Sequence, residues 1–211
     1  PLGTKMASFF VDNLNALEDP RRPIIATEAK DLAGVSLGYK GVPSAYAGSE
    51  SQFDYDASNL NREQVENPMQ IFLFTYAEVE FIKAEMAQRG YTSNAEVHYQ
   101  NGVKGAIEQL ETEITPDYFA NPAAAYDGTL AQILLQKYFA LYFVDYQQWF
   151  EYRRTGLPVL PTTEAMLNDG IMPARFQYPS DVQISNASNY GAALELLGGD
   201  DSINTKVWWD N

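Results

Sequence analysis

Residues 74–91 read FTYAEVEFIKAEMAQRGY, and this stretch carries the clearest structural signal in the chain. Thr75 and Glu78 fit a capping box, in which the Thr75 hydroxyl accepts from the Glu78 N–H and the Glu78 carboxylate accepts from the Thr75 N–H. Arg89 and Gly90 supply a cationic last turn and a terminating glycine. We therefore predict a helix between Thr75 and Arg89 with one apolar stripe, formed by Val79, Ile82 and Met86 together with Ala77, Ala84 and Ala87.

A second amphipathic helix is predicted after a short turn. Residues 93–96, Ser-Asn-Ala-Glu, repeat the capping-box pattern. Apolar residues at helical spacing then run toward residue 112: Val97, Val103, Ile107 and Leu110. Two helices joined by a short turn form an αα-hairpin, and the alanines of the first helix should let the second approach closely.

The third strong helical pattern runs from Asp127, a plausible N-cap, to Arg154, with Gly156 and Pro158 as its stop. Aromatic residues crowd between Tyr138 and Tyr152, so apolar side chains cover nearly the whole circumference. A helix of this kind is expected deep inside a packed assembly.

Elsewhere the pattern is weaker. A short helix is predicted within residues 4–18, whereas residues 24–68 keep no apolar period and should form a long irregular segment. After residue 161 the chain becomes irregular again, with short helical possibilities near 163–168 and 187–197. No repeat, low-complexity segment or transmembrane stretch is apparent.

Length and charge limit the class of protein. The chain has 211 residues, 45% of them hydrophobic, and a formal net charge of −14 at pH 7. At about 150 residues per domain, this length predicts one domain, or part of a larger one, with a real core. Because the excess negative charge repels phosphate backbones and anionic lipids, we expect no nucleic-acid partner and no electrostatic membrane contact.

Several site chemistries are excluded by composition. The chain has no cysteine, which excludes disulfides, thiolate metal sites and cysteine nucleophiles. His98 is the single histidine, and beside Tyr99 on a helix it is interpreted as structural. Asp200, Asp201 and Asn204 lack the spacing of an EF-hand and are interpreted as a solvated turn. We therefore expect no metal site and no cofactor.

Motifs spread along the chain resemble the SusD/RagB family of outer-membrane nutrient-binding lipoproteins. Residues 76–91 are similar to its hallmark helix, and EYRRTGLP at 151–158 is similar to its E-x-R-R-T-G-x-P helix end. MPARFQYP at 172–179, followed by Asn186 and Asn189-Tyr190, resembles its I-P-x-R-x-x-Y-P…N…N-Y stretch. TKVWWD at 205–210 and DPR at 19–21 match its closing motif and an upstream turn, in the family's order.

This resemblance implies a fold and a role. The expected fold is mainly all-α, with tetratricopeptide-like packed helix pairs and long irregular loops. Family members have a lipidated cysteine and a helical half that nothing here matches, so residues 1–211 are expected to be the C-terminal portion of a single SusD-like domain whose N-terminal half is absent. Membrane attachment would come only from an upstream lipid anchor outside this chain.

The role that the resemblance implies is non-catalytic. Family members lie on the extracellular face of the outer membrane and bind oligosaccharides or related nutrients without cleaving them. They deliver these nutrients to a SusC-like TonB-dependent transporter. We therefore expect an oligosaccharide or other nutrient as ligand, the transporter as protein partner, and no enzymatic activity.

Two alternatives of other classes stay open. A carbohydrate-active hydrolase fragment needs two facing carboxylates. Glu78 and Glu85 lie on one helix face, although capping occupies Glu78, and cations such as Arg89 can pair with Glu85. A helical scaffold that joins protein partners, as tetratricopeptide arrays do, is the other alternative. Release of sugar products would favour the hydrolase, and a stable transporter complex without glycan binding would favour the scaffold.

Two of the family motifs also have structural interpretations. Arg153 and Arg154 lie near a helix C-terminus, where they are predicted to satisfy the dipole and the terminal carbonyls. Trp208 and Trp209 are predicted to fill an apolar groove, because a chain end needs large apolar anchors to stay ordered.

The candidate carbohydrate site consists of Tyr39, Tyr46 and Tyr55 in the irregular segment. A sugar ring stacks its C–H face on an aromatic ring while its hydroxyls bond to amides and carboxylates, and these tyrosines lie among Gly, Ser, Asp and Asn residues. The alternative is that the tyrosines hold the long loop against the body of the protein.

Overall fold

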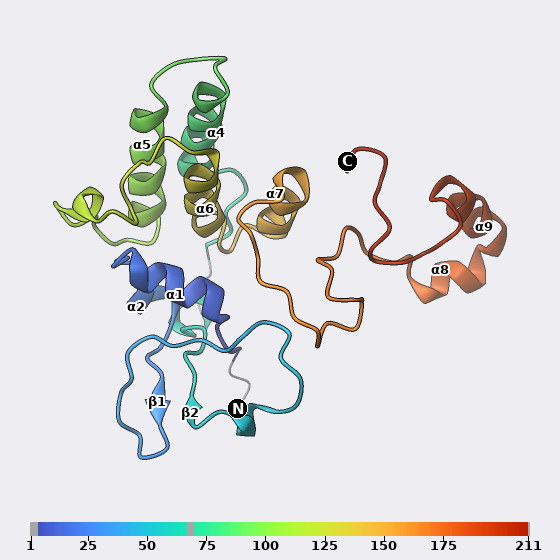
Figure 1. Ribbon diagram of the computed structural model, residues 1–211, viewed down its shortest axis with the longest axis horizontal. Coiled ribbons are helices and arrows are strands. Elements are labelled where there is room, and N and C mark those ends of the chain that lie inside the picture. Colours follow the sequence, from blue (N-terminus) through green and yellow to red (C-terminus); the bar gives the residue numbers. More distant parts are fainter. Residues whose placement is uncertain (1–3, 67–69, 211) are drawn as a thin grey trace. The chain divides into compact units, whose positions relative to one another are not determined.

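The computed structural model describes residues 4–66 and 70–210 and separates into two compact units (Figure 1). Unit 1 comprises residues 1–44 and 48–161, and unit 2 comprises residues 45–47 and 162–211. The described part of the chain is mainly helical, which confirms the predicted all-α class.

Three helices form the body of unit 1: α4 (Tyr76–Gln88), α5 (Ala95–Glu108) and α6 (Leu130–Ala140). Each packs against the other two, and α4 with α5 makes the predicted hairpin (Figure 1). The Thr75 Oγ1 accepts from the Glu78 N–H at 3.1 Å, so the first predicted cap is formed. The second is not, because α5 begins after Asn94, which has a φ of 68° and makes no side-chain capping bond.

The buried face of α4 differs from the predicted stripe. Ala77, Phe81 and Ala84 are buried, whereas Ile82 is 38% exposed. The carboxylates of Glu80 and Glu85 are buried on this helix as well. Hydrophobicity alone placed the stripe wrongly, because two acidic residues lie on the buried face. Lys83 pairs with Glu80, and Arg89 and Arg154 pair with Glu85.

The expected close approach of α4 and α5 is confirmed at one contact. The Phe81 ring of α4 lies on Gly102 of α5, where an added Cβ would come within 3.0 Å of three ring atoms. Interiors are packed to crystal density, so there is no spare volume for a side chain at this crossing. The glycine therefore sets the distance between the two helices.

The N-terminal segment packs beneath these helices. Within the range predicted as helical, α1 (Ser8–Ala16) buries Phe10, Val11 and Leu14, and α2 (Arg22–Ile25) follows. The Phe10 ring meets the Phe139 ring of α6 at 5.2 Å, edge to face. These contacts extend the apolar core of unit 1 from α4 to the N-terminal segment.

A buried polar cluster joins distant parts of unit 1. The fully buried Arg21 donates to Asp19 through Nε at 2.8 Å and Nη2 at 2.6 Å. The Tyr118 hydroxyl, from η2 (Tyr118–Ala120), donates to the same carboxylate at 2.9 Å. Burial opposes ionisation of Asp19, but Arg21 outweighs that effect and lowers the pKa of the carboxyl.

The long segment after α2 is irregular, as predicted, apart from short elements. These are β1 (Lys30–Asp31), η1 (Glu50–Gln52), β2 (Tyr55–Asp56) and α3 (Glu63–Glu66). β1 and β2 pair antiparallel, with Lys30 opposite Asp56 and Asp31 opposite Tyr55. The end of the predicted irregular range, residues 67 and 68, lies outside the described residues.

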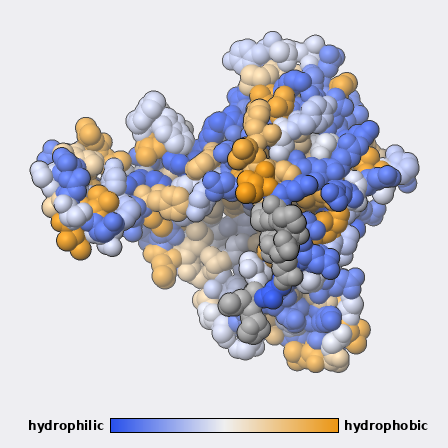
Figure 2. Space-filling model, turned by 180° about the vertical axis from the view of Figure 1, so that it is seen from behind, coloured by the Kyte–Doolittle hydropathy of each residue, from blue (hydrophilic) through white to orange (hydrophobic). Residues whose placement is uncertain are grey.

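An apolar tip projects from β1. The Asp31 carboxylate accepts from the N–H groups of Ala33 and Val35 at 2.9 and 2.8 Å, which fixes the turn. Leu32, Val35 and Leu37 on this turn are exposed, and Figure 2 shows an apolar patch there at the lower edge of unit 1. The turn thus presents apolar side chains on a hydrogen-bonded frame.

The predicted third helix is broken in two. α6 ends at Ala140, and α7 runs from Gln147 to Thr155, ending at Gly156 with a φ of 71° as expected. Between them Phe143 and Asp145 have φ of 67° and 44°. The break changes the direction of the chain, and none of the α7 side chains is fully buried, so the expectation of a deeply buried helix is wrong for this part.

The N-cap of α6 also lies elsewhere than predicted. The Thr129 hydroxyl accepts from the Gln132 N–H at 3.1 Å and is therefore the cap. Asp127 supports it, because its carboxylate accepts from both the N–H and the hydroxyl of Thr129 at 2.8 and 2.7 Å.

Unit 2 contains two short helices, α8 (Ser180–Ser185) and α9 (Ala187–Leu196). The predicted helix at 187–197 is confirmed, whereas residues 163–168 form turns and α8 had no clear sequence signal. Buried Arg175 organises the unit: its Nη1 donates to the Asp201 Oδ1 at 2.6 Å.

The two capping sequences give a matched test of the helix starts. Thr75→Ala removes the bond to Glu78 and should lower the free energy of unfolding by about 1 kcal/mol, as N-cap losses do. Ser93→Ala, at the box that does not form, should change it by less than about 0.5 kcal/mol. Urea denaturation of both variants measures the difference, and equal effects would contradict the assigned caps.

Candidate functional site

Two of the three predicted tyrosines, Tyr39 and Tyr55, contact neighbouring residues of unit 1. The Tyr55 hydroxyl donates to the Gly41 carbonyl at 2.8 Å, and the Lys40 ammonium lies 3.6 Å from the centre of its ring. The Tyr39 ring is partly buried against the core, with the Arg22 guanidinium 5.7 Å from its centre. Each of these rings therefore already has a cation near one face.

The third tyrosine belongs to the other unit. Tyr46 is half-buried and lies in residues 45–47 of unit 2, whereas Tyr39 and Tyr55 lie in unit 1. No ring contact joins Tyr39 to Tyr55 among the aromatic pairs of the described residues. The assignment of a carbohydrate site to these tyrosines stays a prediction.

The acidic residues of α4 form a network with α6 and α7 in unit 1. The Arg154 guanidinium donates to both Glu85 oxygens, at 2.8 and 2.7 Å, and also to Glu151. Arg89 Nε donates to Glu85 at 2.9 Å, and the buried Lys137 ammonium lies 2.9 Å from Glu151. Arg154 was predicted to satisfy the dipole and the terminal carbonyls of its own helix. Its guanidinium instead binds these carboxylates.

The network separates the pKa values of its acids. Burial opposes ionisation of Glu85, but Arg154 and Arg89 outweigh it and lower the pKa of that carboxyl. Burial likewise opposes ionisation of Glu151, and hydrogen bonds from Arg154 and Lys137 overcome it and lower its pKa. The pKa of Glu78 is raised, mainly by burial.

The pKa values of these carboxyls, raised for Glu78 and lowered for Glu85, would suit the acid and the base of a hydrolase, but their positions would not. Glu78 and Glu85 are both buried within the helix packing, and the Glu78 N–H donates to the Thr75 hydroxyl that caps α4. A glycosidase needs its two carboxyls on either side of a bound sugar. These carboxyls face neighbouring helices, so their arrangement is that of a structural network.

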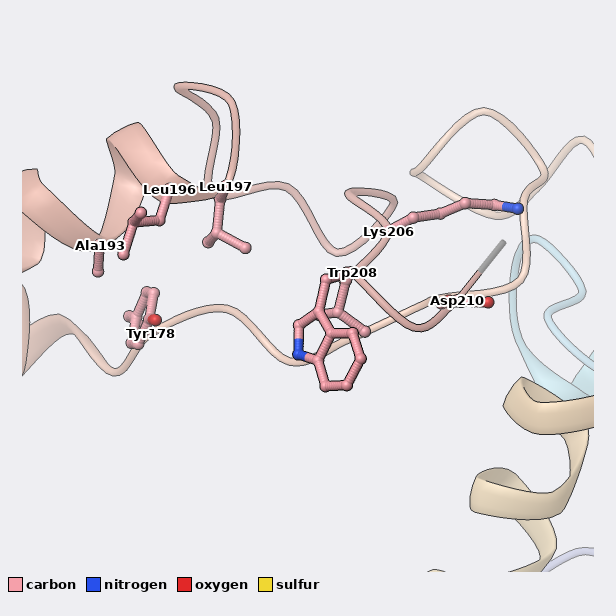
Figure 3. A pocket seen from close by; sticks show the side chains of 8 residues that line it. Tyr178, Ala193, Leu196, Leu197, Lys206, Trp208 and Asp210 are labelled. Atoms are coloured by element: carbon pink, nitrogen blue, oxygen red, sulfur yellow. The ribbon is translucent and has the colours of Figure 1, made fainter.

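An open groove in unit 2 is the candidate binding site. It has a volume of about 680 Å³ and is lined by Tyr178, Ala193, Leu196, Leu197, Lys206, Val207, Trp208 and Asp210 (Figure 3). In the view of Figure 3, Tyr178, Ala193 and Leu196 lie at one end, with Lys206 and Asp210 at the other. The Trp208 indole projects between these two ends.

Asp201 fixes the wall of this groove. Its carboxylate accepts from the Arg175 guanidinium, from the Tyr178 N–H and from the Tyr190 hydroxyl, the last at 3.1 Å. The Tyr178 and Tyr190 rings meet edge to face at 5.8 Å. Partial burial opposes ionisation of Asp201, but Arg175 outweighs it and lowers the pKa of the carboxyl. Tyr178 is therefore held in place before any ligand binds.

The terminal tryptophans do not fill a groove as predicted. Trp208 is 89% exposed and lines one, and Trp209 is exposed as well. The site could have been predicted from one feature of the sequence, the aromatic pair that lies between Lys206 and Asp210. No sequence pattern indicated that Tyr178 would lie on the same groove.

Other candidate centres are accounted for by protein contacts. His98 Nδ1 lies 2.8 Å from the Glu80 carboxylate, as a structural histidine would. Asn168 Nδ2 donates to the Asn204 Oδ1 at 2.8 Å, and Asn204 Nδ2 donates to the main-chain carbonyl of Asn168 at 2.9 Å. Within residues 4–66 and 70–210, no group of acidic or histidine side chains is arranged to hold a metal ion. In these same ranges no helix combines the length and the apolarity needed to cross a bilayer.

A family model covers most of the chain. The SusD-like model described as "Starch-binding associating with outer membrane" matches residues 2–179. Of the groove residues, only Tyr178 lies within that match. No curated protein matches the chain.

Solved structures share the fold. A chitin-binding protein superposes with a TM-score of 0.81 at 26% identity, covering 98% of this chain and 50% of that protein. A SusD homologue from Bacteroides fragilis gives 0.79 at 26% identity, covering 98% and 52%. A SusD-like protein from Bacteroides thetaiotaomicron gives 0.78 at 27% identity, covering 96% and 50%. The chain thus spans about half the length of these structures.

The carboxylate network is predicted to make the folded state less stable in acid, and Glu85 and Glu78 should contribute with opposite signs. Because the folded-state pKa of Glu85 is lowered, its stabilisation is present above the ordinary glutamate pKa of 4.5 and is lost as the pH falls further. Glu85→Gln should cost about 2 kcal/mol at pH 7, less than a fully buried pair, because Arg154 is partly exposed. It should also flatten the acid limb of the stability curve.

Glu78→Gln is the matched control. The pKa of Glu78 is raised, so the folded state takes up its proton first, and this uptake partly offsets the acid loss of stability. Its removal should steepen the acid limb. Chemical denaturation between pH 7 and pH 3 measures both slopes, and a change of the same sign in the two variants would contradict the assigned network.

Proposed function

Because this chain belongs to the SusD-like family described as starch-binding and associating with the outer membrane, we propose that it forms part of a non-catalytic cell-surface protein that binds oligosaccharides. A chitin-binding protein of the same fold, 26% identical over nearly the whole chain, supports a carbohydrate ligand. The family description supports a place at the outer membrane.

The observation that carries the proposal is the exposed aromatic surface of the unit 2 groove. Trp208 presents an indole that is 89% exposed, and Tyr178 lines the same groove. Such rings stack on the C–H face of a pyranose, and Lys206 and Asp210 supply partners for its hydroxyls. Exposed tryptophan is costly in water, so a ligand that covers it gains free energy.

The absence of catalysis is part of the proposal. Glu78 and Glu85, the acidic residues of the hydrolase alternative, are buried in the helix packing of unit 1. Asp210 is the one carboxylate among the groove-lining residues. A hydrolase of the common type needs two.

In the full-length protein, the proposed function includes a larger domain, a lipid anchor and a transporter partner. We infer that residues 1–211 are the C-terminal portion of one SusD-like domain, which the half-length coverage of solved structures supports. The full protein would be lipid-anchored on the extracellular face of the outer membrane. It would deliver its ligand to a SusC-like TonB-dependent transporter.

Calorimetric titration with malto-, cello- and chito-oligosaccharides tests the ligand class. At least one series should bind without release of shorter products, which chromatography of the same mixtures detects. Trp208→Ala should weaken that binding about tenfold, because an aromatic stacking contact is worth up to about 1.5 kcal/mol. Tyr91→Ala, an exposed aromatic outside the groove, should leave the affinity unchanged.

Alanine variants of Tyr39, Tyr46 and Tyr55 complete the test. If these variants bind oligosaccharide more weakly and Trp208→Ala keeps the parent affinity, the site lies in the irregular segment. Binding to none of the three series, or the appearance of cleaved products, would contradict the proposed function.

A further inference from the structure

The outer face of α4 is apolar as well as its buried face. On the side of the helix opposite to the buried Phe81, the side chains are again mostly apolar, and all are at least partly exposed: Tyr76, Val79, Ile82, Met86 and Ala87. Lys83 lies among them, and the other charged residues of α4, three glutamates, are buried. A helix that is apolar around most of its circumference is normally covered on every side, so this outer face needs a covering element.

Neighbouring residues extend the outer face. The Tyr76 ring lies on Gly105 of α5, where an added Cβ would come within 2.8 Å of the ring, so the face continues onto the second helix of the hairpin. Leu73 and Phe74, directly before α4, are 84% and 64% exposed. Exposed apolar side chains gathered in this way mark an interaction surface rather than scattered surface residues.

We propose that the outer face of α4 is covered by a helix from the half of the domain that lies outside residues 1–211, an inference that rests on the proposed function. Val79, Ile82 and Met86 follow one another at spacings of three and four residues and form a ridge of the kind that packs against a second helix. A helical hairpin cannot bury its outer apolar face by itself, and in stacked helix pairs the neighbouring pair covers it.

The size of the similar structures favours this occupant over a second copy of the chain. Three solved structures match 96% to 98% of this chain but only 50% to 52% of their own length. In each of them, a region of about equal size therefore lies outside the matched part. A second copy of this chain would instead bring a further net charge of −14 against the first.

The chemistry of the outer face defines the covering helix. The apolar ridge requires aliphatic or aromatic residues at helical spacing on the facing side. Lys83, with 49% of its side chain exposed beside this ridge, favours an acidic residue at the edge of that helix. The occupant is therefore an amphipathic helix with an acidic border.

Photo-crosslinking in the purified full-length protein identifies the occupant directly. Lys83 is replaced with the photoreactive residue benzoylphenylalanine, because it borders the ridge and its exchange removes no buried apolar side chain. Irradiation should link this position to a peptide from outside residues 1–211 of the same molecule, which mass spectrometry of the digest identifies. The same replacement of Lys104, whose side chain on α5 is 57% exposed, is the control and should give no such link.

Ile82→Asp and Leu37→Asp add a matched measurement of stability, because the two aliphatic residues of unit 1 are similarly exposed in this chain, at 38% and 45%. In the full-length protein Ile82→Asp should lower the melting temperature by about 5 °C, since the covering helix would enclose the carboxylate among apolar side chains. Leu37→Asp, on the exposed turn after β1, should lower it by less than about 1 °C.

The outcomes distinguish the occupants. A cross-link from position 83 to residues 162–211, or a cross-linked species of twice the mass that marks a second copy, overturns the inference. A cross-linking yield at position 83 no higher than at position 104 overturns it as well, as do equal melting temperatures for the two aspartate variants. None of these measurements involves an oligosaccharide, so this inference and the carbohydrate-binding function fail independently.

Discussion

The arrangement of unit 1 depends on a carboxylate placed inside the face of α4. Glu85 is buried between helices, where an unpaired charge would be strongly destabilising. Arg154 of α7 and Arg89 of α4 neutralise it, and Arg154 also binds Glu151, which pairs with Lys137 of α6. Charge pairing therefore fixes α7 against the body, and its aromatic side chains stay partly exposed.

A second buried ion pair also holds unit 1 together. Asp19 and Arg21 are buried together, and Tyr118 ties them to a segment 99 residues further along the chain. The buried charges of this unit are thus committed to holding its segments together. In unit 2, the Arg175 and Asp201 pair likewise holds the wall of the aromatic groove that we propose as the ligand site.

Local signals predicted part of this structure. The Thr75 cap, the glycine stop at Gly156 and the α4–α5 hairpin follow from short-range patterns, and they formed as predicted. The break after α6 did not, because residues 129–155 contain no glycine or proline and the strain falls on Phe143 and Asp145. The buried face of α4 was missed because two of its buried residues are acidic, and Glu85 binds Arg154, 69 residues away, in addition to Arg89. The groove was missed for a similar reason, since Tyr178 and Trp208 meet only through the folding of unit 2.

Sugar binding on Trp208 in unit 2, and not on the tryptophan of unit 1, can be observed directly. The chain has three tryptophans, so a ¹⁵N-labelled sample gives one indole N–H signal for each in a two-dimensional NMR spectrum. Trp149 lies in unit 1 with the Arg153 guanidinium 4.7 Å from the centre of its ring, whereas Trp208 lines the groove. Titration with chitopentaose should shift the Trp208 signal most and leave the Trp149 signal in place. A saturating shift of Trp149 with an unmoved Trp208 would contradict the account.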